Sequence, residues 1–363
     1  MSLLRVNLKT KIDNSYSIYM EIPYIKNLIL DIKRNGEHPK YAIITDSKVK
    51  KLYGIKLQKK LKRAGIKSEV FSFPSGEKYK TLYRVEKLVN QLLKSGFSRD
   101  DSIIALGGGV VGDVAGLVAS LYMRGVPYVQ IPTTLLAMVD SSIGGKTGVD
   151  TQSGKNLIGT FHQPKNVYID FTFLQTLPKK QIKNGIAEII KYGVIYKPSL
   201  LKLLDKKHEE ISNLDKKILK KLVSKCIAIK ASIVQEDEKE SNARKILNYG
   251  HTIGHAIEKT TNFKIQHGEG VAIGMSIINT IAKNKKFITQ KDKEYISSII
   301  KKYKLPYNLP KSTNPNKIIE AIKYDKKIKK NKLTFIIPTK IGKVVVTDKI
   351  TSNDIIKACK KHI

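Results

Sequence analysis

Residues 102–123 read SIIALGGGVVGDVAGLVASLYM, and this stretch decides the class of fold. The short apolar run at 102–106 leads directly into glycines, and a run typical of a helix follows from Val114. Strand, turn and helix in that order form the repeating unit of a parallel sheet. Glycines at such a turn let the backbone approach a pyrophosphate lying on the helix N-terminus, where Asp113 would also be favourable. The spacing differs from the usual GxGxxG, and a glycine cluster can also be only a tight turn.

The flanking residues continue the same alternation. The predicted elements are a strand at 40–46, a helix at 48–64, a strand at 68–73, a polar loop at 75–81, a helix at 82–96, and strands at 128–132 and 167–170. Ligands of such sheets bind at the carboxyl ends of the strands. Lys146, Lys155 and Asn156 follow the strand at 128–132 among glycines and serines, a setting that suits an anionic, oxygen-rich ligand. Two lysines alone mean little in a chain this rich in lysine.

Beyond Pro178 the apolar spacing becomes that of helices. The predicted helices are 186–194, 200–210, 216–236, 246–259, 270–287, and one that begins at Asn314 and Pro315 and runs to about 324. We therefore predict two domains, a Rossmann-like α/β domain with a parallel sheet at 1–178 and a mainly α-helical domain at 179–363.

Three of the seven histidines of the chain fall within residues 248–275. His251 and His255 are four residues apart, which places them on one face of a helix, and His267 opens the next apolar segment. Imidazole is the commonest protein ligand of divalent metals and the side chain best suited to proton transfer near pH 7. The window therefore offers two metal ligands and an acid–base group. Satisfied structural histidines are the alternative, because HxxxH also occurs by chance.

Charged residues in the helical half are a second candidate feature. Glu188 is an acid on an otherwise apolar turn, three residues before Lys191, and a buried acid needs a partner such as a metal. Lys230, Glu240 and Arg244 precede the histidines and could form an anion clamp. The alternative is a surface carboxylate at 188 and half-exposed helix charges at the other three positions.

Length and composition restrict the classes of protein. The 363 residues, 41% apolar and 27% charged, are enough for two buried cores. Cys226 and Cys359 are the only cysteines, which favours a reducing compartment over a disulfide framework. The N-terminal residues lack the apolar core of a signal peptide, and the apolar run at 103–123 carries Asp113 and several glycines. We expect a cytoplasmic protein with no membrane segment.

The formal net charge of +36 raises the question of nucleic-acid binding. The charge is spread along the chain, and only seven of the 67 basic residues are arginine. Recognition surfaces favour the planar fork of arginine, and no zinc-finger or RNP-type motif occurs. We attribute the charge to a compositional bias towards lysine and expect no specific nucleic-acid partner.

Eight motifs occur in a fixed order along the chain. They are GGGVVGD (107–113), RG (124–125), PTTLLAMVDSSIGGKTG (132–148), GKN (154–156), AEIIKYG (187–193), NYGHTIGHAIE (248–258), HGEGVAIGM (267–275) and DKK (325–327). In this order, and with a weaker match at 75–81, they resemble the 3-dehydroquinate synthase family of sugar phosphate cyclases. Two departures are Asp150, where the family usually has Asn, and Asn331, where it usually has Gly.

The resemblance implies roles for individual residues. The implied ligands of Zn²⁺ or Co²⁺ are Glu188, His251 and His267, with His255 free for proton transfer and phosphate contact. The implied substrate-binding residues are Arg124, Lys146, Asn156, Lys230, Arg244 and Lys326 or Lys327, with Asp140, Glu240 and Asn248 as polar partners. The implied NAD contacts are Asp46, Glu77, Lys78, Lys80, Gly108, Gly109, Val110, Gly112, Asp113, Thr133, Thr134, Lys146, Lys155, Phe173 and Thr176.

The resemblance also implies a reaction and a homodimer. The substrate would be 3-deoxy-D-arabino-heptulosonate 7-phosphate, oxidised transiently by NAD, relieved of phosphate by elimination, reduced again and closed into the carbocycle 3-dehydroquinate. Sister cyclases, such as 2-deoxy-scyllo-inosose or amino-dehydroquinate synthase, share most of these residues. An iron-type polyol dehydrogenase is a further alternative, which would release NADH. A carboxylate on the substrate separates the first reading from the carboxylate-free sister cyclases, and Arg244 with Lys230 suits one.

Overall fold

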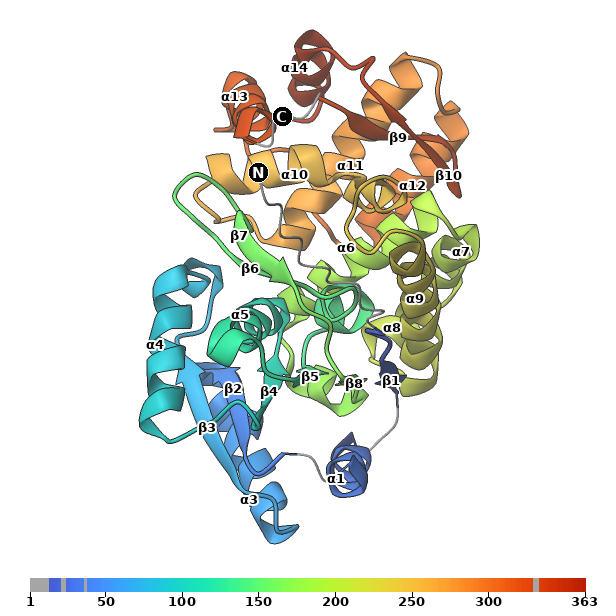
Figure 1. The fold of residues 1–363 in the computed structure, drawn as a ribbon. Helices are drawn as coiled ribbons and strands as arrows, with labels where there is room; N and C mark the ends of the chain where they lie inside the picture. Colours follow the sequence, from blue (N-terminus) through green and yellow to red (C-terminus); the bar gives the residue numbers. More distant parts are fainter. Residues whose placement is uncertain (1–12, 21–23, 36–37, 329–332) are drawn as a thin grey trace, which may run out of the picture.

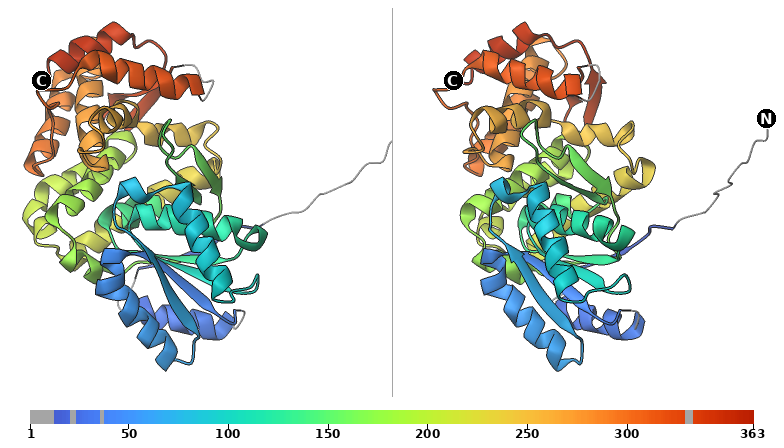
Figure 2. Two further views of the ribbon diagram at one scale, coloured as in Figure 1. Left: turned by 90° about the vertical axis from the view of Figure 1, so that its left-hand side faces the viewer. Right: turned by 60° about the vertical axis from the view of Figure 1, so that its left-hand side comes forward.

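The computed structural model describes residues 13–20, 24–35, 38–328 and 333–363. A sheet of parallel strands forms the N-terminal half, and helices form most of the C-terminal half (Figure 1). The two halves lie one above the other in Figure 1, and the turned views of Figure 2 show the same division. Within the described residues, none of the helices combines the length and apolarity needed to span a membrane.

The sheet has six strands, and every pairing in it is parallel. In spatial order the strands are β1 (Ser17–Tyr19), β8 (Asn166–Tyr168), β5 (Tyr128–Pro132), β4 (Ser102–Gly107), β2 (Tyr41–Asp46) and β3 (Ser68–Phe73). The chain passes from β2 to β3 on one side and returns to β4 on the other. The switch in strand order therefore lies between β2 and β4, which is where α/β sheets of this kind bind ligands.

Side chains of alternate strand residues pack into two apolar clusters. Ala42 and Ile44 of β2 face one cluster, and Tyr41 and Ile43 face the other, as the period of two of a strand requires. The helices and short turns of this half are α1 (Tyr24–Asn35), α2 (Ser47–Val49), η1 (Lys50–Gly54), α3 (Ile55–Arg63), η2 (Glu77–Tyr79), α4 (Leu82–Lys94), α5 (Gly109–Leu121), η3 (Tyr122–Arg124), η4 (Ala137–Ser141) and η5 (Phe171–Thr176). The predicted strands and helices of this half are present.

Helix α5 begins earlier than the sequence predicted. The prediction began the helix at Val114 with Asp113 at its start, but α5 begins at Gly109, which places Asp113 in the second turn. Glycine has poor helix propensity, so the propensities alone favour the later start. Tertiary packing decides otherwise, since Val111, Val114 and Val118 of this helix are all buried against the sheet.

A hairpin that the sequence analysis did not predict joins the two halves. Strands β6 (Lys146–Val149) and β7 (Ile158–Phe161) pair antiparallel, and in Figure 1 the hairpin extends from the sheet half towards α10 (His251–Thr260). The polar residues 150–157 connect the two strands. Asp150, one of the two departures from the resembled family, lies in that segment, and its Oδ1 accepts a hydrogen bond from the Asn156 N–H at 2.9 Å.

The helical half contains most of the predicted helices and several further elements. Its members are α6 (Lys179–Ile195), α7 (Pro198–Lys206), α8 (His208–Ser212), α9 (Lys216–Glu236), η6 (Ala243–Asn248), α10, α11 (His267–Asn284), α12 (Gln290–Lys302), α13 (Pro315–Ile328), β9 (Phe335–Lys340), β10 (Lys343–Thr347) and α14 (Ser352–Lys360). The sequence analysis missed α12, α14 and the β9–β10 hairpin. The domain boundary at 178/179 stays a prediction; α6 begins at Lys179.

The predicted continuous helix at 246–259 is wrong. The chain forms the 3₁₀ segment η6, turns at Gly250 with a left-handed φ of 78°, and only then enters α10. Arg244 and His251 are therefore not two turns apart on one helix. A Cβ at Gly250 would lie 2.7 Å from Met275 Cγ, so both the backbone conformation and the packing require glycine here.

Helices α10 and α11 pack with their backbones in close contact. A Cβ at Gly274 would lie 2.1 Å from the Gly250 carbonyl oxygen and 2.9 Å from the Gly254 nitrogen. Both obstructing atoms belong to the backbone, so neither can rotate away as a side chain would. The small residues of HGEGVAIGM thus permit the contact that brings the histidines of the two helices together.

We predict that Gly274→Ala destabilises the protein by roughly 1–3 kcal/mol, the usual cost of overpacking. Thermal denaturation followed by circular dichroism measures the effect as a fall in Tm. The matched control is Gly54→Ala, because Gly54 has helical backbone angles and its Cβ would meet nothing closer than 3.5 Å. The control should be neutral or slightly stabilising, and an equal loss in both variants would contradict the packing argument.

Candidate active site

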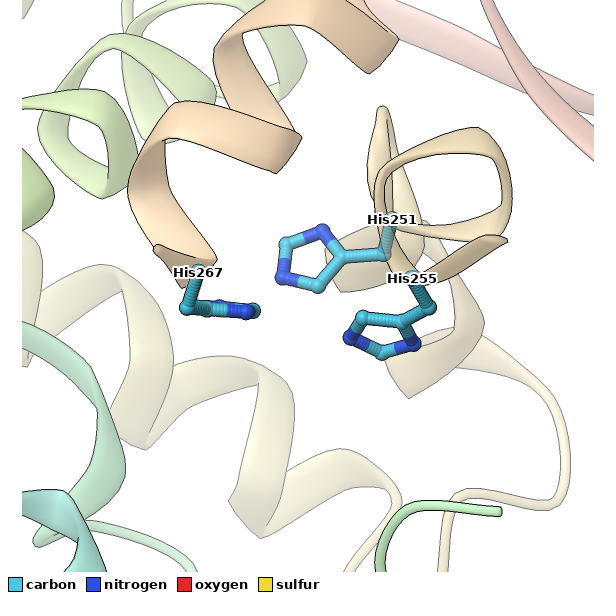
Figure 3. Close-up of side chains that lie close together, drawn as sticks. All are labelled: His251, His255 and His267. Carbon is cyan, nitrogen blue, oxygen red and sulfur yellow. The ribbon is translucent and has the colours of Figure 1, made fainter. Parts of the chain in front are cut away.

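Three histidines converge where α10 meets α11 (Figure 3). His251 is the first residue of α10, His255 lies one turn later, and His267 is the first residue of α11. One ring nitrogen from each lies within 4.8 Å of the others. The close packing of Gly250 and Gly254 against Gly270 and Gly274 holds the first turn of α10 against α11.

Glu188 of α6 supplies a carboxylate to the same point. Its Oε1 lies 3.4 Å from His251 Nε2 and 3.3 Å from His267 Nε2, and the side chain is completely buried. Lys191 Nζ forms an ion pair with Oε2 at 2.6 Å. Among the described residues, neither oxygen of Glu188 accepts a regular hydrogen bond. Burial alone would raise the pKa of Glu188, but Lys191 and His251 hold it well below its usual range, so the group is a carboxylate.

The Nδ1 atoms of His251 and His267 also have hydrogen-bond partners. His251 Nδ1 lies 3.1 Å from the Tyr249 carbonyl oxygen, and His267 Nδ1 lies 3.1 Å from Glu258 Oε1. Both partners are acceptors, so each Nδ1 can carry a hydrogen and leave Nε2 available to bind a metal ion. Two Nε2 atoms and a carboxylate oxygen that face one another form a site for a cation, either a metal ion or a proton on His267.

The residues fit a metal ion of the zinc type. Ligands about 2.0–2.1 Å from a tetrahedral ion are about 3.4 Å apart, which matches the 3.3 and 3.4 Å separations around Glu188 Oε1. Burial lowers the pKa of His267, but Glu258 and Glu188 outweigh burial and raise it to about 10. A strong attraction for positive charge therefore exists at this point.

His255 is the neighbour of this ligand set. Its ring centroid lies 5.4 Å from that of His251 and 5.6 Å from that of His267. Burial lowers the pKa of His255 well below its usual value, although Glu258 opposes the shift. The imidazole is therefore neutral at pH 7 and can accept a proton.

A buried cluster of charges lies beside Glu188. Asp140 Oδ1 accepts from Lys230 Nζ at 2.7 Å and from the Tyr192 hydroxyl at 2.5 Å, and Lys191 Nζ is 4.0 Å away. Burial would raise the pKa of Asp140, but Lys191 and Lys230 outweigh it and lower the pKa. The cluster thus pairs two cations, Lys191 and Lys230, with two carboxylates, Asp140 and Glu188.

Other predicted substrate residues form a second polar group. Glu240 makes an ion pair with Lys146 and accepts from Asn248 Nδ2 at 2.7 Å. The Arg244 guanidinium is 1% exposed and donates to the carbonyls of Glu238 at 2.5 Å and Gly144 at 3.1 Å. A Cβ at Gly144 would lie 2.5 Å from Arg244 Nη2, so glycine is required for this contact. These contacts use two of the five N–H donors of Arg244, and its Nε makes no hydrogen bond within the described residues.

The predicted dinucleotide residues follow the carboxyl ends of the strands. The N-terminus of α5 follows β4 through Gly108, and within the described residues no side chain caps it, so its N–H groups can face a phosphate. Lys80 is buried, pairs with Asp113 at 2.5 Å, and donates to Asn156 Oδ1. Burial raises the pKa of Asp113, although Lys80 opposes the shift.

The remaining predicted NAD contacts lie along the same edge. Asp46 ends β2 and caps α2, accepting from the Lys48 and Val49 N–H groups at 2.8 and 3.1 Å. Thr133 and Thr134 follow β5, and Phe173 and Thr176 lie in η5 after β8. The other members of the predicted set are Glu77, Lys78, Gly109, Val110, Gly112 and Lys155, in η2, at the start of α5 and in the hairpin.

One predicted substrate residue makes no contact with the others, and another has a side chain outside the described residues. Arg124 is exposed at the end of η3, and no hydrogen bond or ion pair joins it to another predicted site residue that the structure describes. The side chains of Lys326 and Lys327, and all of Asn331, lie outside the described residues.

Three residues at the site were not assigned to it from the sequence. Lys191 had been noted only for its spacing from Glu188, while Tyr192 and Glu258 had no role. Glu258 lies seven residues after His251, two turns along the same face of α10, and that spacing could have indicated it.

Comparison with known proteins identifies the family. The family model described as the 3-dehydroquinate synthase N-terminal domain matches residues 70–184, and the one described as the C-terminal domain matches residues 185–328. The chain belongs to the 3-dehydroquinate synthase family. It is 43% identical to the 3-dehydroquinate synthase of Desulforamulus reducens over 98% of this chain and 99% of that protein. It is 45% identical to that of a Thermoanaerobacter species over 99% of this chain and 100% of that protein.

Similar solved structures include two cyclases of other names. The 2-epi-5-epi-valiolone synthase of Streptomyces hygroscopicus, solved with NAD⁺ and Zn²⁺ bound, has a TM-score of 0.91 at 26% identity and covers 99% of both chains. A 2-deoxy-scyllo-inosose synthase, complexed with carbaglucose-6-phosphate, NAD⁺ and Co²⁺, has a TM-score of 0.84 at 28% identity and covers 96% of both chains. The predicted family and fold class are thus confirmed.

Two sets of three residues could bind a metal ion: Glu188 with His251 and His267, or the three histidines. Variants distinguish the two sets. We predict that Glu188→Gln, His251→Ala and His267→Ala each abolish bound zinc, because each removes one of the three converging donor atoms. His255→Ala should keep a full complement of zinc. Plasma mass spectrometry of dialysed protein measures the content, with circular dichroism as the folding control. Loss of zinc from His255→Ala together with its retention in Glu188→Gln would instead favour the three histidines as ligands.

Proposed function

We propose that the protein is a 3-dehydroquinate synthase, a carbon–oxygen lyase of class EC 4.2.3.4. It would convert 3-deoxy-D-arabino-heptulosonate 7-phosphate to 3-dehydroquinate and phosphate, with NAD and Zn²⁺ or Co²⁺ as cofactors. The observation that carries the proposal is the convergence of Glu188, His251 and His267 beside the buried ion pairs of Asp140 with Lys230 and Lys191. The identity of more than 40% to relatives of that name, over nearly full length, supports the same reaction.

Different residues are suited to bind the metal, the dinucleotide and the substrate in this reaction. When bound, NAD takes a hydride and later returns it, while the metal ion polarises the carbonyl formed. Glu188, His251 and His267 would hold the metal, and the α5 N-terminus would hold the dinucleotide phosphates. Lys230 is fixed by Asp140, so it can donate to an anionic group without reorganising.

Proton transfer and substrate binding fall to other side chains. His255 is neutral, so its imidazole can accept a proton and later return it. This proton transfer would accompany removal of the substrate proton at C6. The departing phosphate takes the electron pair of the breaking C–O bond. Lys146 and Asn156 stand at the hairpin, where they can donate to substrate oxygens. The predicted roles of Arg124 and Lys326 in binding substrate rest on the family motif alone.

Three further expectations belong to the proposal. The family resemblance supports a homodimer, and the cysteine usage supports a cytoplasmic location. The scattered lysines support the absence of a specific nucleic-acid partner.

We predict that NAD acts in catalytic amounts. Phosphate release from the heptulosonate phosphate should need NAD well below the substrate concentration and should stop when a chelator removes the metal. Absorbance at 340 nm should stay flat during turnover, because the hydride is returned. NADH accumulating in step with product would indicate a polyol dehydrogenase instead.

We predict that Arg244→Lys removes a preference for substrates with a carboxylate. A lysine cannot form two parallel hydrogen bonds, so binding should weaken by about 1.5–3 kcal/mol. The value of kcat/KM for the carboxylate substrate should therefore fall roughly tenfold to a hundredfold. The comparison uses the heptulosonate phosphate and a sugar phosphate without a carboxylate, in wild type and variant, with Tm as the measure of folding. A lower Tm with an unchanged preference would assign Arg244 only to holding Gly144 and Glu238. The sister cyclases would then gain support.

A further inference from the structure

Glu258 stands between the metal pocket and the sheet half. It lies on α10 and is 1% exposed, and its Oε1 accepts from His267 Nδ1 at 3.1 Å. A Cβ at Gly270 would lie 3.1 Å from Glu258 Cγ, so the second glycine of HGEG leaves room for this side chain. A carboxylate that bonds the outer nitrogen of a ligand histidine fixes the ring and strengthens the ligand.

The other oxygen of Glu258 contacts the sheet half. Lys155 Nζ lies 2.6 Å from Glu258 Oε2 and 3.1 Å from Glu77 Oε1, and its side chain is only 14% exposed. Lys155 comes from the segment between β6 and β7, and Glu77 follows β3 at the dinucleotide edge. Burial lowers the pKa of Lys155, but the two carboxylates outweigh burial and raise it, so the lysine stays charged.

A second contact holds the same segment on α10. Lys259 Nζ donates to the Ser153 carbonyl at 3.0 Å from an exposed position. Within the described residues, Lys259 pairs with neither Glu258 nor Glu77, whereas Lys155 pairs with both. The chain from Glu77 through Lys155 and Glu258 to His267 is therefore a specific connection, separable from general adhesion of the hairpin to α10.

We propose that Glu258 is a positioning residue for the metal ligand His267, and that Lys155 couples metal binding to dinucleotide binding through Glu77. The coupling rests on the proposed metal and NAD sites. A dinucleotide that orders Glu77 and Lys155 also fixes Glu258 and so tightens the metal. By linkage, the metal tightens the dinucleotide by the same factor.

Zinc affinity and NAD affinity test the coupling without any measurement of activity. A chromophoric chelator competes for Zn²⁺ with and without saturating NAD, and calorimetry gives the NAD affinity of metal-free and zinc-loaded protein. In wild type, NAD should tighten zinc by about fivefold or more, with the reciprocal factor for NAD. Glu258→Gln should weaken zinc by about 10- to 100-fold.

The coupling factor is the ratio of the zinc affinities with and without NAD. In Lys155→Met this factor should be close to one, and the loss of zinc affinity should be smaller than in Glu258→Gln. The matched control is Lys259→Met, which should keep the wild-type factor. Equal zinc affinity with and without NAD in wild type, or a full coupling factor in Lys155→Met, would overturn the inference. Wild type that binds neither zinc nor NAD would refute the proposed function itself, which is a different result.

Discussion

The backbone contact between α10 and α11 is the constraint on which the site depends. Gly250, Gly254 and Gly274 let the two helices approach until carbonyl and amide groups leave no space for a Cβ. Only at that distance do the first residues of the two helices, His251 and His267, face the same carboxylate. Glu188 lies in the buried part of α6 and contacts both histidines from there.

Charge compensation explains why so many ionisable groups can be buried there. Asp140, Glu188 and Glu258 each have cationic or imidazole partners within the described residues, and buried charges without partners would be strongly destabilising. The pairs form two routes outward from Glu188, one through Lys191 to Asp140 and one through His267 to Lys155. Such networks also hold each side chain in one place, as binding and catalysis require.

Local sequence predicted the parallel sheet well, because apolar runs of strand length bounded by glycine and polar turns have few other interpretations. It predicted boundaries less well where packing overrides propensity. The early start of α5 in glycines and the break at Gly250 are examples, since both depend on neighbours distant in the chain. The hairpin at 146–161 carries polar and small residues, so its pairing has little local signal.

By itself the sequence determined the fold class, the family and the residue types of the site. The ordered motifs indicate the family and the site residues, and the spacing of the apolar residues indicates the fold class. Residue types and spacing left the metal ligands open, since Glu188 is more than sixty residues from His251 and either triad has suitable chemistry, and only the family resemblance named Glu188, His251 and His267. Tertiary structure also decided that Lys191 and Glu258 belong to the site and that Arg244 faces two carbonyls. Distances between side chains from different helices depend on packing, and no local pattern encodes them.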